Sequence, residues 1–159
     1  MTMTTVTQVL AVLSLVLLGA MAGLFYGFTI SVMPGLDAIR PDQAVAAMRS
    51  ANRKILNPVF LLMYLAAPVA PVAAGVLLLV QDVPAAGTAF LGAGGLYVLG
   101  AFAVTAAVNV PMNNALEAGR GEPERLWAAY STRWRRWNTL RGLVSFASLA
   151  IAGVGLLLW

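Results

Sequence analysis

Residues 6–32 read VTQVLAVLSLVLLGAMAGLFYGFTISV, inside a run without charge that extends from Met1 to Leu36. At about 1.5 Å of rise per residue, about 20 apolar residues cross the roughly 30 Å hydrocarbon core of a bilayer. Three further runs also lack charge, 55–81, 83–116 and 142–159. A bilayer accepts only helices or closed barrels, and unbroken apolar runs favour helices. The sequence therefore predicts an all-α polytopic membrane four-helix bundle, a single transmembrane domain over 1–159, with helices near 6–32, 57–80, 85–109 and 139–159.

The composition agrees with a membrane protein. Hydrophobic residues make up 60% of the chain and charged residues 10%, whereas soluble domains carry about 25% charged residues. Cysteine and histidine are both absent, which excludes disulfides, thiolate catalysis, the usual zinc sites, His-ligated haem and imidazole triads. We expect no metal and no cofactor. The leader Met1 to Gln8 has no Lys or Arg, so we expect the first segment to be a retained helix rather than a cleaved signal peptide.

All ten basic residues fall at one end of the predicted bundle. Four lie between the first two helices, and six lie between the last two or at the start of the fourth. The positive-inside rule then predicts a multi-pass protein with both termini outside. The Ala- and Arg-rich composition favours the plasma membrane of a bacterium. The position of the basic residues at the membrane surface accounts for the net charge of +4. We therefore expect no nucleic acid partner.

Small residues on the first helix predict a packing surface. Gly19, Gly23 and Gly27 recur every four residues, a pattern that lets a neighbouring helix approach closely. We expect packing inside the bundle, with a homo-oligomer face as the alternative. Pro68 and Pro71 are expected to bend the second helix, which transmembrane helices tolerate.

Short amphipathic helices are predicted in the two cytoplasmic connections, near 41–55 and 122–138. In the first, Val45, Met48, Asn52 and Ile55 share one face, so Asn52 is expected to point inward. Asn57 precedes Pro58, a combination typical of a helix start, although a ligand contact is the alternative.

Two further groups of polar residues point to the same end. Thr105, Asn109 and Asn113 are spaced by four and form a stripe that is either interhelical hydrogen bonding or a ligand contact. The second connecting helix runs into the fourth span, and Arg141 lies one turn deeper than its aromatic residues. An arginine at that depth is a functional-site candidate. The predicted shared face comprises Trp127, Tyr130, Trp134, Trp137, Asn138 and Arg141.

Four segments resemble the signatures of the anthrone oxygenase-like (DUF1772) membrane proteins. They are Met33-Pro34, Asn52 to Phe60 (NRKILNPVF), Thr105 to Asn113 (TAAVNVPMN) and Trp134 to Arg141 (WRRWNTLR). The fungal members associated with polyketide pathways oxidise anthrones to anthraquinones with O2. The resemblance thus implies an oxidoreductase, cofactor-independent and membrane-embedded, that acts on a flat hydrophobic small molecule of the anthrone or phenol type.

Such a reaction assigns roles to the polar residues. The catalytic candidates, which would donate hydrogen bonds to an enolate oxygen, are Arg141, Asn138, Asn109 and Asn113. The candidates for substrate binding are Asn52, Asn57, Phe60, Thr105, Trp134 and Trp137. For the general base, Asp37, Glu117 and water remain open. The alternative function is a non-enzymatic membrane protein that binds a lipid, an isoprenoid or a quinone.

Overall fold

The computed structural model describes residues 2–159 and contains four helices long and apolar enough to cross a membrane. The first comprises α1 (Met3–Gly27), a π-helical turn (η1, Phe28–Val32) and α2 (Met33–Asp37). The second is α4 (Pro58–Val80). The third joins α5 (Pro84–Tyr97), two π-helical turns (η2, Val98–Phe102; η3, Thr105–Asn109) and α6 (Val110–Ala118). The fourth is α7 (Pro123–Leu157). The predicted all-α membrane bundle is confirmed.

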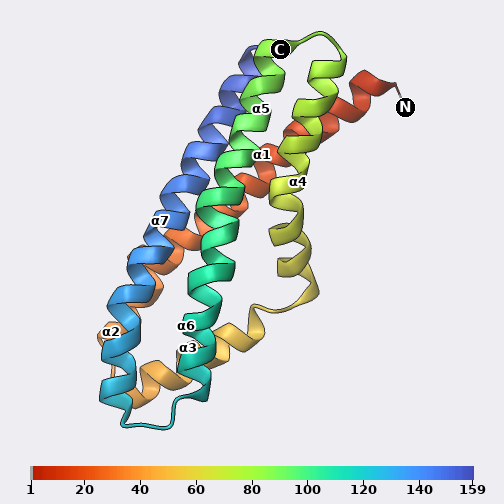
Figure 1. The fold of residues 1–159 in the computed structure, drawn as a ribbon. Coiled ribbons are helices and arrows are strands. Elements are labelled where there is room, and N and C mark those ends of the chain that lie inside the picture. Colours follow the sequence, from red (N-terminus) through yellow and green to blue (C-terminus); the bar gives the residue numbers. More distant parts are fainter. Residues whose placement is uncertain (1) are drawn as a thin grey trace.

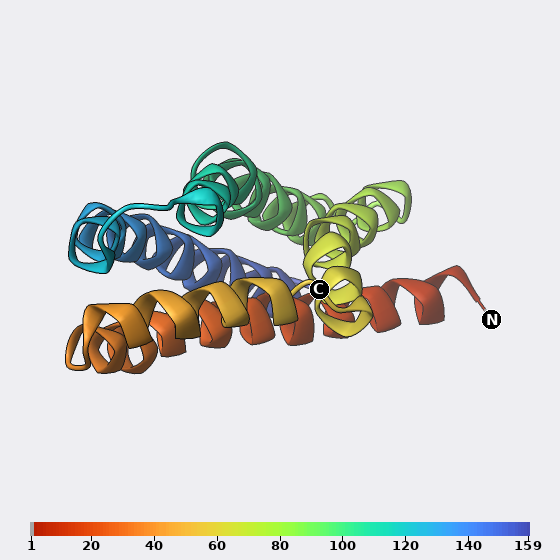
Figure 2. The ribbon, with the colours of Figure 1, turned by 90° about the horizontal axis from the view of Figure 1, so that it is seen from below.

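Each long helix packs against two others, so that α1, α4, α5 and α7 form a closed ring (Figure 1). Both termini lie at one end of this ring. The amphipathic helix α3 (Pro41–Lys54) runs across the opposite, basic end, from α2 to the start of α4 (Figure 1 and Figure 2). Val45 and Met48 of α3 are buried as expected, and α3 thereby closes that end of the bundle.

The helices extend further than the sequence predicts. The first helix continues through Pro34, and the third continues through Pro111 to Ala118. A proline lacks an N–H, and its ring collides with the carbonyl of the residue four positions earlier. Those earlier residues lie inside η1 and η3, whose wider turns accommodate the two prolines. The predicted connecting helix 122–138 and the fourth span form one continuous helix.

The glycines that bring helices together are not those that the sequence suggested. A Cβ on Gly23 or Gly27 would meet nothing within 4 Å, and one on Gly19 would make an ordinary contact with Leu149. The prediction of close packing is therefore wrong at Gly23 and Gly27. The close approach occurs between α4 and α5, where a Cβ on Gly75 would lie 2.9 Å from the carbonyl oxygen of Gly87.

Two clusters of buried side chains stabilise the fold. The larger lies within the helix ring and includes Phe25. The smaller lies at the basic end, between α2, α3, α6 and α7, and includes Trp134. Phe25 and Trp134 also line one cavity, so this cavity marks the place where the two clusters meet.

Candidate functional site

A cavity of about 220 Å³ lies between α1, the α3–α4 junction, η3–α6 and α7. Eight of the ten residues predicted as catalytic or substrate-binding line it. These eight are Asn52, Phe60, Thr105, Asn109, Asn113, Trp134, Asn138 and Arg141. They come from three separate segments of the chain, 52–60, 105–113 and 134–141, and the fold brings them to one place.

Arg141 is a buried cation on the cavity wall, only 5% exposed. Its Nη1 donates to Thr105 Oγ1 at 2.9 Å and its Nη2 to Asn138 Oδ1 at 2.8 Å. Its guanidinium carbon lies 4.4 Å from the ring centroid of Phe25 and 5.6 Å from that of Trp134. These are neutral dipoles and π faces, which hold the charge without neutralising it.

Within the described residues 2–159, no carboxylate pairs with Arg141. The three ion pairs within residues 2–159 are Arg40–Asp42, Arg53–Glu117 and Arg135–Asp37. A buried charge without a counter-ion is costly unless other groups stabilise it. The cavity therefore presents an uncompensated positive charge to any molecule that enters.

Asn138 positions Arg141. Its Nδ2 donates to the carbonyl oxygen of Phe25 at 2.7 Å and to Thr29 Oγ1 at 2.8 Å, while its Oδ1 accepts from Arg141. Both amide hydrogens are thus engaged with α1 and η1. Asn138 therefore holds the guanidinium in place, with both of its donor hydrogens bonded within the protein. Its predicted role as a donor to an enolate oxygen stays a prediction.

Asn109 is the opposite case. Its side chain is 1% exposed, and neither its Oδ1 nor its Nδ2 has a hydrogen-bond partner in the described chain. Asn52 Nδ2 and Arg141 Nε are also buried without a partner. Buried polar groups are normally hydrogen-bonded, so three side chains with unmet atoms on one wall make this cavity the candidate binding site.

Four aromatic rings line the cavity, alongside aliphatic side chains. Trp134 donates through Nε1 to Asn113 Oδ1 at 2.8 Å, and its ring lies 5.7 Å from that of Phe28. Tyr130 also donates to Asn113 Oδ1 at 2.8 Å, so only the Nδ2 amide of Asn113 remains for a ligand. Phe60 belongs to a separate stack with Tyr64. A flat apolar molecule can contact ring faces on either side.

Two predicted site residues do not reach the cavity. Asn57 Oδ1 accepts from the backbone N–H of Phe60 at 3.0 Å, and Asn57 is therefore the cap of α4, the first of its two predicted roles. Trp137 lines a separate hollow with Arg133 and Arg136. At about 100° per residue, Trp137 lies about 60° around α7 from Trp134, and this rotation takes it out of the site.

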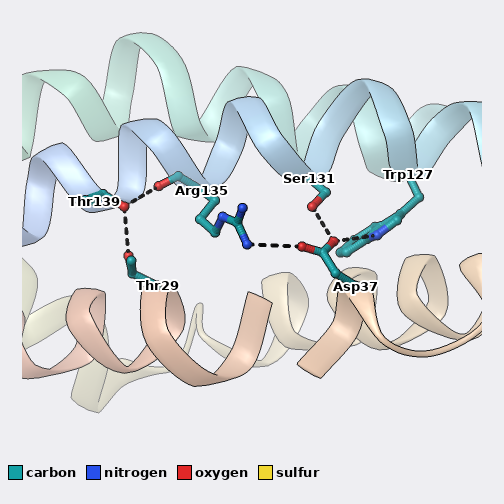
Figure 3. Close-up of polar contacts among 6 residues, drawn as sticks. All are labelled: Thr29, Asp37, Trp127, Ser131, Arg135 and Thr139. Atoms are coloured by element: carbon teal, nitrogen blue, oxygen red, sulfur yellow. Dashed lines mark hydrogen bonds and ion pairs between the residues drawn. The ribbon is translucent and has the colours of Figure 1, made fainter. Parts of the chain in front are cut away.

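The candidate bases separate in space. Asp37 accepts from Trp127 Nε1 at 3.0 Å and from Ser131 Oγ, and pairs with Arg135 Nη1 at 3.3 Å. Figure 3 shows Asp37 joining the end of α2 to α7, and it does not line the cavity. Glu117 is the one acid on the cavity wall, where its Oε1 accepts from Arg53 Nη1 at 2.7 Å.

Phe25 and Phe28 were not predicted from the sequence. They line the cavity from α1 and η1, within a segment so uniformly apolar that no residue stands out. The π-helical turn η3, which contains Thr105 and Asn109, was also missed. Such turns often occur at functional sites, and Pro111, six residues after Thr105, was the available signal.

The fold and this cavity define a polytopic helical membrane protein with a polar, aromatic-walled site at the basic end of its bundle. A family profile described as Anthrone oxygenase matches residues 59–151, more than half of the chain, and the chain belongs to this family. The resemblance seen in the sequence is thereby confirmed. The matched residues include η3, α6 and the part of α7 that carries Arg141. Asn52 and Phe25 lie outside the match. No curated protein and no solved structure matches the chain.

Proposed function

We propose that this protein is a membrane-embedded oxygenase that oxidises a flat, hydrophobic, enolisable molecule of the anthrone or phenol type, without a resident cofactor. The observation that carries the proposal is Arg141, a buried cation on the cavity wall with no acidic partner. Such a charge stabilises an oxyanion, and one well-placed donor in other oxyanion sites contributes about 3 to 4 kcal/mol to the transition state.

The unmet hydrogen bonds define the polar part of the substrate. Three of the unmet atoms are donors that need an acceptor oxygen: Arg141 Nε, Asn52 Nδ2 and Asn109 Nδ2. The fourth, Asn109 Oδ1, is an acceptor and needs a donor. A ligand that carries both an enolate or carbonyl oxygen and a hydroxyl group meets both requirements. A purely apolar ligand meets neither.

The reaction then follows from the ligand. Loss of a doubly benzylic proton, to water or to Glu117, leaves an aromatic enolate whose oxygen Arg141 stabilises. The enolate transfers one electron to O2, the two radicals combine as a carbon-bound peroxide, and protonation with loss of water leaves the new carbonyl. One O2 is consumed and one water is released. The protein positions the ring, stabilises the anion and excludes bulk water.

The proposed membrane location and orientation of the protein rest on the distribution of its positive charges. All ten basic residues belong to one end of the chain's bundle, and we place this end in the cytoplasm at the plasma membrane, with both termini outside. The open face around Gly23 and Gly27 of α1 is the surface through which we propose that a homo-oligomer would form.

Oxygen uptake tests the catalytic proposal. Purified protein in detergent is given a simple anthrone, with Arg141→Ala and the exposed Arg125→Ala measured in parallel to account for autoxidation. We expect Arg141→Ala to lose about 100-fold in turnover and Arg125→Ala to lose none. Uptake that no variant changes would contradict the proposal. If wild type shows no uptake but binds a quinone or an isoprenoid, the non-enzymatic alternative replaces it.

A further inference from the structure

A second hollow, of about 620 Å³, lies on the outer face of α7, and no residue of the Arg141 cavity lines it. It occupies the level where the charged first half of α7 gives way to the apolar second half. Ala128 and Ala129 contribute short side chains, and the longer Arg133 and Arg136 border them. All the residues that line this open hollow belong to α7.

The two arginines of this hollow have no acidic partner. Some other arginines at the basic end are engaged: Arg53 and Arg135 form ion pairs, and Arg49 donates to the carbonyl oxygens of Leu116 and Gly119. What sets the two arginines of the hollow apart from the unpaired Arg120 and Arg125 is that they border the same hollow. Arg133 and Arg136 take part in none of the ion pairs within residues 2–159. No acid lines the hollow, whereas Thr132 adds a hydroxyl. The positive charge and the hydrogen-bond donors that line this hollow therefore favour the binding of an anion.

The same face continues as a surface suited to an acyl chain. Trp137 is half-buried beside the arginines, and tryptophan is enriched at the level of lipid headgroups. One and two turns further along α7, Leu140 is 40% exposed and Leu143 is 64% exposed. Charge, aromatic ring and exposed leucines thus follow one another in the order of the parts of a phospholipid.

We propose that this hollow is a binding site for an anionic phospholipid of the leaflet at the basic end. The phosphate lies between Arg133 and Arg136, the glycerol region contacts Trp137, and an acyl chain follows Leu140 and Leu143. Two guanidinium groups hold a phosphate through charge-assisted hydrogen bonds. The site is independent of the Arg141 cavity and of any reaction there.

Native mass spectrometry of the full chain tests the site. The protein is released from detergent with phosphatidylglycerol or phosphatidylcholine, and retained lipid is measured for wild type, for Arg133→Gln/Arg136→Gln, and for Arg120→Gln/Arg125→Gln. The last variant loses the same charge from exposed arginines outside the hollow. We expect one retained phosphatidylglycerol, an affinity loss of about tenfold to thirtyfold in Arg133→Gln/Arg136→Gln, and no such loss in the control.

Quenching of tryptophan fluorescence locates the lipid. In vesicles, phosphatidylglycerol brominated near the headgroup should quench wild type more than the same label on phosphatidylcholine, and Trp137→Phe should remove that difference. Excess inorganic phosphate should not displace the lipid, because the acyl contacts would be missing. Equal loss in both double variants, equal retention of the two lipids, or displacement by phosphate alone would overturn the proposal.

Discussion

At the scale of single residues, two buried asparagines of the same cavity differ in what their side chains contact. Asn138 uses both ends of its amide within the protein, whereas Asn109 uses neither. An unsatisfied buried polar group costs about 1 to 3 kcal/mol. We therefore expect the unmet amide of Asn109 to lower the stability of the protein.

We predict that substitution of these asparagines by leucine, which has a similar volume, changes stability in opposite directions. Asn109→Leu should raise the free energy of unfolding by about 1 kcal/mol, because it removes an unmet polar group. Asn138→Leu should lower it by about 2 kcal/mol or more, because it leaves Arg141 Nη2 without its acceptor and removes the hydrogen bonds to the Phe25 carbonyl oxygen and to Thr29 Oγ1. Thermal unfolding in detergent measures both. Destabilisation by Asn109→Leu would show that its amide is satisfied in the folded protein.

The same Asn109→Leu variant separates two kinds of ligand. A phenol donates a hydrogen bond to Asn109 Oδ1, and a quinone of the same ring size cannot. We predict that wild type binds a naphthol more tightly than a naphthoquinone and that the variant loses this preference, a change of about tenfold for one hydrogen bond. The fluorescence of Trp134, which lines the cavity, reports binding. A preference that survives in Asn109→Leu would assign the selection to another group.

At the scale of elements, glycine spacing alone did not identify the helix contacts. Gly19, Gly23 and Gly27 form a regular pattern, yet the close approach uses Gly75 and Gly87. The glycine spacing indicates that a helix has a face of small residues. Which helix lies against that face depends on the tertiary arrangement. The sequence could predict the elements themselves, because charge and apolar length determine them.

Paired alanine substitutions test this interface. In Gly75→Ala the new Cβ would lie 2.9 Å from both the Gly87 carbonyl oxygen and the Leu91 backbone nitrogen. Backbone must then shift, and we predict a loss of about 1 to 3 kcal/mol in stability. In Gly23→Ala the Cβ meets nothing within 4 Å, so we predict no loss. Unfolding by denaturing detergent compares the two, and equal stability would show that α4 and α5 can separate without cost.

At the scale of the whole molecule, much of the candidate site was predictable because its polar residues stand out against an apolar chain. Arg141, Asn109 and Asn113 are conspicuous for that reason. The sequence could not show which of their atoms lack partners, because that depends on where α1 and α3 pack. Nor could the sequence show that Asp37 contacts α7 outside the cavity. A single acidic residue forms no periodic pattern from which its neighbours in the fold could be predicted.

The distribution of positive charge predicts how the protein is oriented in the membrane. All ten basic residues lie in α3, in the α2–α3 and α6–α7 connections, or in α7 no further along than Arg141, and moving such residues across a membrane is unfavourable. The chain has no cysteine, so one introduced cysteine gives a signal without background. Ser50 of α3 and Ala85 of α5 are both exposed and lie at opposite ends. In intact cells, a membrane-impermeant maleimide should label Ala85→Cys at once and Ser50→Cys only after lysis; the reverse result would place the Arg141 cavity and the proposed phospholipid site on the outer side.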